Sequence, residues 1–294
     1  MAEDSPSGCV ACGWTTEQQD QCFYSSHVKL FYGASRRGVW SIGTDVIMKE
    51  RPDKGPKTEV KTLNHLAKYP DIPAPKVLRD WVDGNRRYFV LQERIQGQTL
   101  EQAWPLLSES QKTAIADQVI EVRNQLRSIT SGSIQSVDQS PCYPGLLFSD
   151  REPHGPFHSD LELWEAISRT LHAVPQRALE ILKKRLPRCE PYVLTHCDLN
   201  LGNIMVKDGG VLAGILDWEF AAYYPIWYEY VSASWGWTEE DAEWKRLLQE
   251  RLDVHGDRHT DAKDFWKDLR LLRKYPNLDE KGREIFEKLC LDER

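Results

Sequence analysis

The second half of the 294-residue sequence contains four polar residues whose types and spacing could support chemistry. His196 and Asp198 are separated by one residue, Asn203 follows five residues after Asp198, and Asp217 ends a later apolar segment. An aspartate can accept the proton of an attacking hydroxyl group, while an amide oxygen and a second carboxylate can hold Mg²⁺ against nucleotide phosphates. We therefore predict that Asp198 is a catalytic base for phosphoryl transfer and that Asn203 and Asp217 are metal ligands.

The segments around these residues predict how they are positioned. An apolar strand at 193–195 ends at the loop that contains His196 and Asp198. A second apolar strand follows Asn203, and a turn with two consecutive glycines leads back into a third strand, which ends just before Asp217. Such a hairpin would bring the two proposed metal ligands together. We expect His196 to orient the loop rather than to react.

The rest of the chain predicts an α+β protein with two parts. Short strands separated by glycines at 28–49, a helical pattern at 56–68 and a hairpin around residues 83–85 together predict a small antiparallel sheet with one helix. Helical patterns then dominate, and their predicted ranges are 110–129, 160–174, 175–186 and three more beyond residue 225. The predicted organisation is a leader at 1–23, a nucleotide-binding N-lobe at 24–96 and a helical C-lobe at 97–294.

The order His-x-Asp-x-x-x-x-Asn, followed by Ile-Leu-Asp-Trp-Glu, resembles the signature of the aminoglycoside phosphotransferase and choline kinase family. The strings GPF at 155–157 and YYPIWYEY at 223–230 resemble fungal members of that family. The resemblance covers residues 24–252. It implies a two-lobed, protein-kinase-like fold and transfer of the γ-phosphate of ATP, with Mg²⁺, to a hydroxyl group of a small metabolite or antibiotic.

Two alternatives to a small-molecule kinase stay open. Protein kinases share the first half of the signature, but they have D-F-G where this chain has Asp217-Trp218-Glu219, and the chain lacks an A-P-E segment. The second alternative is a kinase-like nucleotide-binding pseudoenzyme. It is suggested by Cys197, which stands where the family usually has glycine between the histidine and the aspartate and could narrow the site or make it oxidisable.

Residues of the predicted N-lobe suggest nucleotide contacts. Lys49 ends a strand that resembles the kinase strand whose lysine pairs with the α- and β-phosphates. Glu59, on the following helix, is the candidate ion-pair partner of Lys49, and a solvated helix charge is the alternative. By resemblance Ser35 contributes a hydroxyl group from a phosphate loop, although that segment also fits a structural turn. Glu93 and Ile95 lie where related enzymes bind adenine through backbone atoms.

The acceptor site is expected in the second lobe. Acidic residues, among them Asp160 and Glu219, and many aromatic residues between Trp218 and Trp237 would suit an amine or a quaternary ammonium group. Glu219 is the strongest candidate for a carboxylate on the substrate side. The alternative is that most of these aromatic side chains form the core of the lobe.

Composition excludes several classes of function. The formal net charge of −7 argues against a nucleic-acid partner, and no apolar stretch is long enough to cross a membrane. The acidic, polar amino terminus is not typical of a secretory signal, so a cytoplasmic location is expected. Cys9, Cys12 and Cys22 do not complete a four-ligand zinc site, which favours a loosely ordered leader with free thiols. The sequence indicates no oligomeric state.

Overall fold

The computed structural model describes residues 28–34, 36–55, 57–150, 152–276 and 279–291. The predicted leader with its three cysteines lies outside these residues. Compactness divides the chain into two units, here called unit 1 (Met1–Ile115 and Leu201–Glu219) and unit 2 (Ala116–Asn200 and Phe220–Arg294). The lobe boundaries at 96 and 97 stay a prediction from the sequence.

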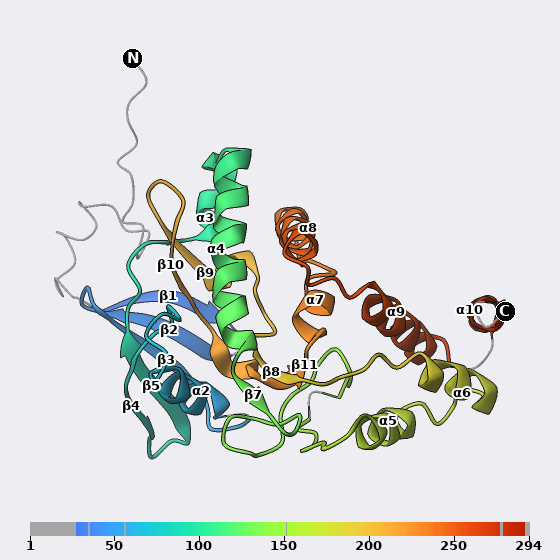
Figure 1. The fold of residues 1–294 in the computed structure, drawn as a ribbon. Helices are drawn as coiled ribbons and strands as arrows, with labels where there is room; N and C mark the ends of the chain where they lie inside the picture. Colours follow the sequence, from blue (N-terminus) through green and yellow to red (C-terminus); the bar gives the residue numbers. More distant parts are fainter. Residues whose placement is uncertain (1–27, 35, 56, 151, 277–278, 292–294) are drawn as a thin grey trace. The chain divides into compact units, whose positions relative to one another are not determined.

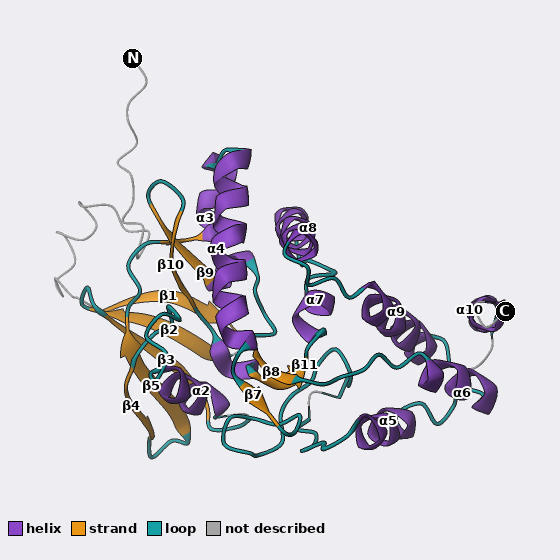
Figure 2. Cartoon of the chain, in the orientation of Figure 1, coloured by secondary structure: helices purple, strands orange, loops and turns teal. Residues whose placement is uncertain are grey.

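The first part of unit 1 is a five-stranded antiparallel sheet with helix α2 beside it (Figures 1 and 2). The strands pair in the order β1-β2-β3-β5-β4, and their bounds are β1 (Val28–Ala34), β2 (Arg37–Ile42), β3 (Val46–Pro52), β4 (Val77–Val82) and β5 (Arg87–Glu93). Helix α2 (Thr58–Leu66) follows β3. This part of the structure confirms the sheet, the helix and the turn that the sequence predicts between β4 and β5.

Alternation of side chains explains how this sheet packs. Along β5 every second residue is buried, as a strand with one covered face requires. Tyr88 and Val90 of that strand form a buried cluster with Val60 of α2, and Val77 of β4 packs against it. The apolar stripe of α2 thus covers one face of the sheet beside β3, the strand that carries Lys49.

A second sheet of unit 1 holds the hairpin predicted around Asn203. Its order is β10-β9-β6, with β6 (Gln98–Thr99), β9 (Ile204–Lys207) and β10 (Val211–Ile215), all antiparallel. Helix α3 (Leu100–Ala103) and the 3₁₀ helix Trp104–Leu106 follow β6. Gly97 has φ +137°, and a Cβ atom there would overlap the carbonyl oxygen of Val206. The chain therefore needs glycine where it runs against β9.

Unit 2 is mainly helical and has a small sheet of order β11-β8-β7. The strands are β7 (Thr130–Ser131), β8 (Tyr192–Thr195) and β11 (Ala222–Pro225). The helices are α5 (Asp160–Arg169), α6 (Gln176–Lys184), α7 (Tyr228–Ser232), α8 (Glu239–Val254), α9 (Thr260–Lys274) and α10 (Glu280–Leu291), whereas α4 (Glu109–Arg127) contributes residues to both units. Every residue of β8 and β11 is buried.

Most aromatic residues after β11 begins are core residues. Tyr224, Trp227, Tyr228 and Tyr230 are each at most 2% exposed, while Trp237 is 75% exposed. The rings of Tyr224 and Tyr228 stack with centroids 4.3 Å apart. The structure therefore supports the alternative in which these rings form the core of the lobe, and they do not line an open aromatic pocket.

The surface adds two observations. None of the helices in the described ranges has the length and apolar character needed to cross a membrane.

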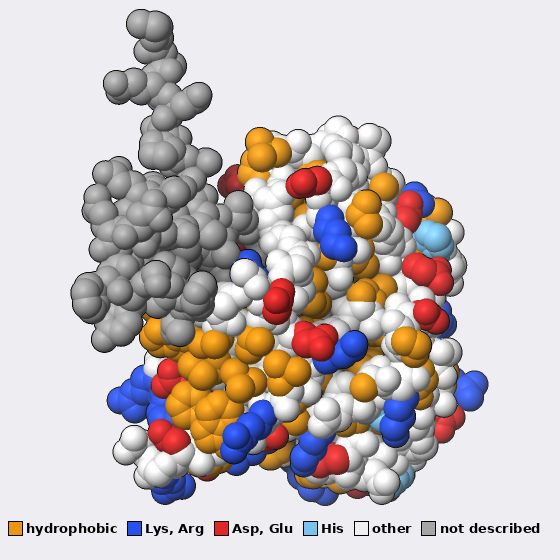
Figure 3. Space-filling model, turned by 90° about the vertical axis from the view of Figure 1, so that its left-hand side faces the viewer, with side chains coloured by type: hydrophobic (Ala, Val, Ile, Leu, Met, Phe, Trp, Pro, Cys, Tyr) orange, Lys and Arg blue, Asp and Glu red, His pale blue; other side chains and the backbone are white. Residues whose placement is uncertain are grey.

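In Figure 3 hydrophobic side chains gather at the lower left of the viewed face, on the side where Figure 1 shows the strands of unit 1. Exposed apolar side chains of these strands include Leu78 and Val82 of β4.

Candidate active site

Lys49 lies at the centre of a charged group within unit 1. It is the fourth residue of β3, where its backbone pairs with β2 on one side and β5 on the other. Its Nζ atom forms an ion pair with Oε1 of Glu59, from α2, and another with Oδ1 of Asp217 at 3.1 Å. The exposed fractions of the three side chains are 20%, 12% and 38%. A strand, a helix and a loop therefore bring one cation to two carboxylates.

The pKa values in this group follow from burial and charge. Burial alone would lower the pKa of Lys49, but the charges of Asp217 and Glu59 outweigh it, and the pKa is raised above its ordinary value. Burial also raises the pKa of Glu59, as do the neighbouring carboxylates of Asp217 and Glu219, while Lys49 opposes them. The ammonium group is thus held charged in a site with an excess of negative charge.

The hairpin of β9 and β10 places Asn203 beside Asp217. Asn203 directly precedes β9, and β10 ends two residues before Asp217. Leu216 N donates a hydrogen bond to the carbonyl oxygen of Asn203 at 2.7 Å, which extends the strand pairing to the site. Asp217 has φ +61°, a left-handed conformation that aspartate tolerates better than most residues. Such conformations often occur at ligand-binding loops.

These residues line a cavity of about 630 Å³ that lies wholly within unit 1. The residues predicted from the sequence that line it are Lys49, Glu59, Glu93, Ile95, Asn203, Asp217 and Glu219. Gly97 and Gln98, from the segment between β5 and α3, also contribute to its wall. Ser35, the proposed phosphate-loop hydroxyl, lies outside the described residues. The cavity has the size of a site for a nucleotide-sized molecule.

The cavity carries an excess of negative charge. Among the described residues that line it, six side chains are acidic and four are basic, which gives a formal charge of −2. A triphosphate would add several more negative charges, and a bound cation would offset the resulting repulsion. Asn203 and Asp217 supply an amide oxygen and a carboxylate in this wall. These are hard oxygen donors of the kind that Mg²⁺ prefers, and Mg²⁺ commonly binds through one or two protein groups plus phosphates and water.

Among the described residues there is no group of three or more His, Cys, Asp or Glu side chains that could hold a metal ion. A site of one aspartate and one asparagine falls below that number. The donor set therefore fits a metal that arrives together with a phosphate chain.

The loop that contains the proposed base is held from unit 2. Glu229, from α7, is 3% exposed, and its Oε2 accepts hydrogen bonds from the backbone N–H groups of His196 at 3.0 Å and Cys197 at 3.2 Å. The backbone N–H of Asp198 donates to Nδ1 of the buried His196 at 3.2 Å. Asn200 Nδ2 donates to Asp198 Oδ1 at 2.9 Å. The side chain of His196 thus accepts a hydrogen bond within the loop, a buried carboxylate binds the loop backbone, and the orienting role of His196 stays a prediction.

Cys197 occupies a backbone conformation that favours glycine. Its φ is +76°, in the left-handed region, where a Cβ atom costs about 1–2 kcal/mol. Its thiol is half-buried beside the carbonyl oxygen of Thr195, with Sγ 3.7 Å from that oxygen. Burial, followed by the charge of Glu229, raises the pKa of the thiol well above its ordinary value. A neutral thiol is a poor nucleophile, so the loop gains no reactive cysteine.

Asp160 and Glu219, the two candidate carboxylates for acceptor binding, belong to different units. Asp160 is the first residue of α5 in unit 2, and its Oδ2 accepts a hydrogen bond from the backbone of Cys189 at 3.3 Å. Glu219 is in unit 1, where Arg37 Nη1 donates to its Oε1 at 2.8 Å. Thr58 Oγ1 donates to its backbone oxygen. Each carboxylate thus has a polar partner within its own unit, and a role for either in acceptor binding stays a prediction.

Sequence reasoning missed two residues of this arrangement. Glu229 lies within the aromatic run, and no pattern in the sequence marks it as an anchor for the loop of His196. Arg37 follows Arg36 in a short basic run, a pattern that is typical of a solvated surface. Its position directly after the turn between β1 and β2 is the signal that could have identified it.

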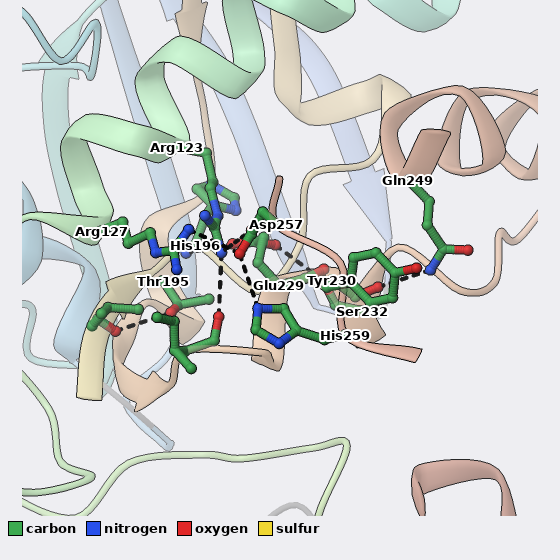
Figure 4. Close-up of polar contacts among 12 residues, drawn as sticks. Arg123, Arg127, Thr195, His196, Glu229, Tyr230, Ser232, Gln249, Asp257 and His259 are labelled. Atoms are coloured by element: carbon green, nitrogen blue, oxygen red, sulfur yellow. Dashed lines mark hydrogen bonds and ion pairs between the residues drawn. The ribbon is translucent and has the colours of Figure 1, made fainter. Parts of the chain in front are cut away.

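Unit 2 also contains a buried network of ion pairs near the loop of His196 (Figure 4). Arg123 of α4 is 4% exposed and pairs with Asp257, which is 3% exposed. Asp257 also pairs with Arg127 and with His259, each at 2.9 Å. Figure 4 shows these side chains converging close to His196 and Glu229. The network ties α4 to the segment between α8 and α9.

Comparisons with known proteins identify the family of this chain. The model of the phosphotransferase enzyme family, APH, matches residues 33–264, which include every part of the site described above. The chain belongs to the APH phosphotransferase enzyme family. The recognition made from the sequence is therefore confirmed, and this chain is a phosphotransferase of the small-molecule kinase type. A search of curated proteins gave no match.

Solved APH structures share the fold. The apo form of a thermostable mutant of aminoglycoside phosphotransferase APH(4)-Ia is 15% identical, with a TM-score of 0.57, and the alignment covers 90% of this chain and 93% of that one. The streptomycin-ATP-APH(2")-IIa ternary complex is 14% identical, with a TM-score of 0.53 and coverage of 90% of each chain. These matches confirm the predicted α+β, protein-kinase-like fold of this APH family member.

Proposed function

We propose that this protein transfers the γ-phosphate of ATP to a hydroxyl group of a small molecule in a Mg²⁺-dependent reaction. The observation that supports this most is the cavity of unit 1, which is lined by Lys49, Glu59, Asn203 and Asp217 and has a formal charge of −2. A divalent cation would offset the repulsion between these carboxylates and a triphosphate. A lysine for the phosphates, followed along the chain by an asparagine and an aspartate for the metal, is the set of groups expected for phosphoryl transfer in kinases.

In the proposed mechanism the residues have separate tasks. Lys49, held by Glu59, binds oxygens of the phosphate chain, and Asn203 with Asp217 would hold Mg²⁺. When bound, Mg²⁺ neutralises negative charge on the phosphates. Asp198 accepts the proton of the acceptor hydroxyl as its oxygen bonds to the γ-phosphorus, and the bond from that phosphorus to the bridging oxygen of ADP breaks. His196 and Glu229 hold the loop of Asp198 in position.

Solved relatives guide the choice of nucleotide and acceptor. The matching structures include a ternary complex of an APH(4)-Ia mutant with ADP and hygromycin B, and a complex of APH(2")-IIIa with GDP and kanamycin. We propose ATP as the donor here, and a hydroxyl-bearing small molecule, neutral or cationic, as the acceptor. Carboxylates such as Glu219 would suit an amine on that acceptor.

The test separates nucleotide binding from transfer. Mg·ATP binding is measured by calorimetry for the wild-type chain, and ADP release is then measured against a broad panel of hydroxyl compounds. Asp198→Asn should leave ATP affinity within about twofold and reduce turnover by about 10²–10⁴-fold, since general-base catalysis has that magnitude. Asp208→Asn, in the exposed turn between β9 and β10, makes the same chemical change away from the loop and should retain turnover.

Two results would contradict the proposal. ATP binding without transfer to any compound of the panel would favour the pseudoenzyme, and full turnover of Asp198→Asn would remove Asp198 from the role of base.

A further inference from the structure

Arg37 has a position that the proposed mechanism does not use. It is the first residue of β2, directly after the turn residue Arg36, and it lines the same cavity as Lys49 and Asp217. Its guanidinium Nη1 donates a hydrogen bond to Oε1 of Glu219 at 2.8 Å. A basic side chain of the cavity is therefore engaged by a carboxylate.

The two partners of this ion pair differ in how firmly they are held. The side chain of Glu219 is 8% exposed, and its backbone oxygen accepts a hydrogen bond from Thr58, the first residue of α2. The side chain of Arg37 is 49% exposed and lines the cavity. Ion pairs with a partner this exposed contribute little to stability, because water and salt screen them. Breaking the pair should therefore cost little.

Arg37 and the proposed metal ligand Asp217 line the same cavity. The hydrogen bond from Arg37 to Glu219 raises the pKa of Arg37, burial opposes this, and the charges of Glu219, Asp217 and Glu59 add to the rise. Arg37 thus interacts with the same carboxylates that surround Lys49. A phosphate chain that contacts Lys49 and a metal on Asp217 would lie within reach of its guanidinium group.

From these contacts we propose that Arg37 binds the terminal phosphate of the nucleotide, and that Glu219 holds its guanidinium group until the nucleotide arrives. The inference rests on the proposed function, because it needs a triphosphate in this cavity. It assigns Arg37 as a phosphate-binding residue and Glu219 as its competitor.

Charge explains why such a residue is needed. Both carboxylates beside Lys49 offset its charge, so Lys49 alone gives the phosphates little net attraction. A guanidinium group presents a planar fork of N–H donors that matches two phosphate oxygens, and such charge-assisted bonds are stronger than neutral ones. Arg37 can exchange one singly bonded carboxylate oxygen for two oxygens of a more highly charged group. The exchange favours the nucleotide.

Competition predicts opposite effects for the two partners. Without Arg37, the terminal phosphate loses a ligand and binding weakens. Without the Glu219 carboxylate, Arg37 is released and the excess negative charge falls, so binding tightens. An ion pair that served only the fold would give the same direction for both changes.

The experiment measures dissociation constants by calorimetry for Mg·ATP and Mg·ADP, with no acceptor present. Arg37→Gln should raise the Kd for Mg·ATP about tenfold, a loss typical of one charge-assisted contact. The Kd for Mg·ADP should change about twofold or less, because ADP lacks the terminal phosphate. Arg37→Lys, which keeps the charge but not the fork, should lie between wild type and Arg37→Gln. Glu219→Gln should lower the Kd for Mg·ATP about two- to threefold.

Arg36→Gln is the matched control. It removes the same charge one residue away, from an exposed side chain that does not line the cavity, and should leave both constants unchanged. Thermal unfolding of each variant verifies that it is folded, and Glu219→Gln gives an independent answer if Arg37→Gln is not. Equal loss for ATP and ADP in Arg37→Gln, or weaker binding in Glu219→Gln, would overturn the inference. A wild-type chain that binds no Mg·ATP would instead overturn the proposed function itself.

Discussion

Two groups of charged residues use the same chemistry in different surroundings. In the cavity of unit 1, Lys49 and its partners keep exposed fractions between 12% and 38%. In the network of unit 2, Arg123 and Asp257 are only 4% and 3% exposed. A charge that stays in contact with solvent can exchange its partner for a ligand, whereas a fully desolvated one is committed to its protein partner. Exposure therefore separates the ion pairs that serve binding from those that serve the fold.

The sharpest way to test this difference is to remove the buried acceptor. Asp257→Asn should lower the free energy of unfolding by about 3–5 kcal/mol, because Arg123 is left buried without a counter-charge. Urea unfolding followed by circular dichroism measures this. Asp264→Asn, at a surface pair with Lys267 on α9, should cost less than about 1 kcal/mol. Equal losses in the two variants would remove the distinction.

The opposite pattern is expected at the cavity. Lys49→Ala should reduce kcat/KM by about 10²-fold, the scale found when one group that stabilises developing charge is removed, yet lower the free energy of unfolding less than Asp257→Asn does, because its group keeps some contact with solvent. Lys57→Ala is a suitable control, because Lys57 pairs with Asp53 next to α2 and does not line the cavity. Steady-state kinetics and urea unfolding are the two measurements. A large loss of stability without loss of activity would contradict this assignment.

Acid provides a smaller, graded perturbation of the buried network. Burial would raise the pKa of Asp257, but the hydrogen bond with His259 and the charges of Arg123 and Arg127 outweigh it and leave the pKa below the ordinary 3.8. Since the folded-state pKa is depressed, the stabilisation is fully present above pH 3.8 and is lost as the pH falls through the folded-state value.

The stability difference between wild type and Asp257→Asn should therefore stay constant near neutral pH and shrink under acid. Chemical unfolding at a series of pH values measures it. A difference that grows on acidification would mean that the sign of the shift is wrong.

The smallest expected effect concerns the loop between His196 and Asp198. Cys197→Gly should raise the free energy of unfolding by about 0.5–1 kcal/mol, because glycine relieves the left-handed strain but gains freedom in the unfolded chain. Cys197→Ala keeps the Cβ atom and should give no such gain. If alanine stabilises as much as glycine, the thiol and not the backbone is responsible.

Local patterns in the sequence were enough to predict most of the fold. Glycine turns and the alternation of apolar and polar residues predicted a small antiparallel sheet, which has five strands in the structure. The hairpin that joins Asn203 to Asp217 was predicted from two apolar strands and a tight turn. The predicted helix at 160–174 ends at Arg169 in the structure, and the short helix α7 adds to the three helices predicted beyond residue 225. The two-residue strands β6 and β7 were missed, because their pairing depends on distant segments rather than on local periodicity.

The candidate site was predictable where residue type and spacing carry the chemistry. That holds for Asp198, Asn203 and Asp217, whose roles stay predictions until they are tested. The pair of Arg37 and Glu219 was not predictable, since its members lie 182 positions apart and only Glu219 belongs to the signature. The burial of the aromatic run was open for a similar reason, because aromatic residues suit both a pocket and a core.

The structure should tolerate no larger residue in place of Gly97. Glycine between two parts of a chain usually suggests a swivel, but here it is needed because no side-chain atom fits against Val206 of β9. Any larger residue would have to displace β9, and Asn203 directly precedes that strand. A mutation at residue 97, far along the sequence from the phosphate-binding groups, would therefore act as an active-site mutation, and an enzyme weakened in this way would keep every one of its signature residues.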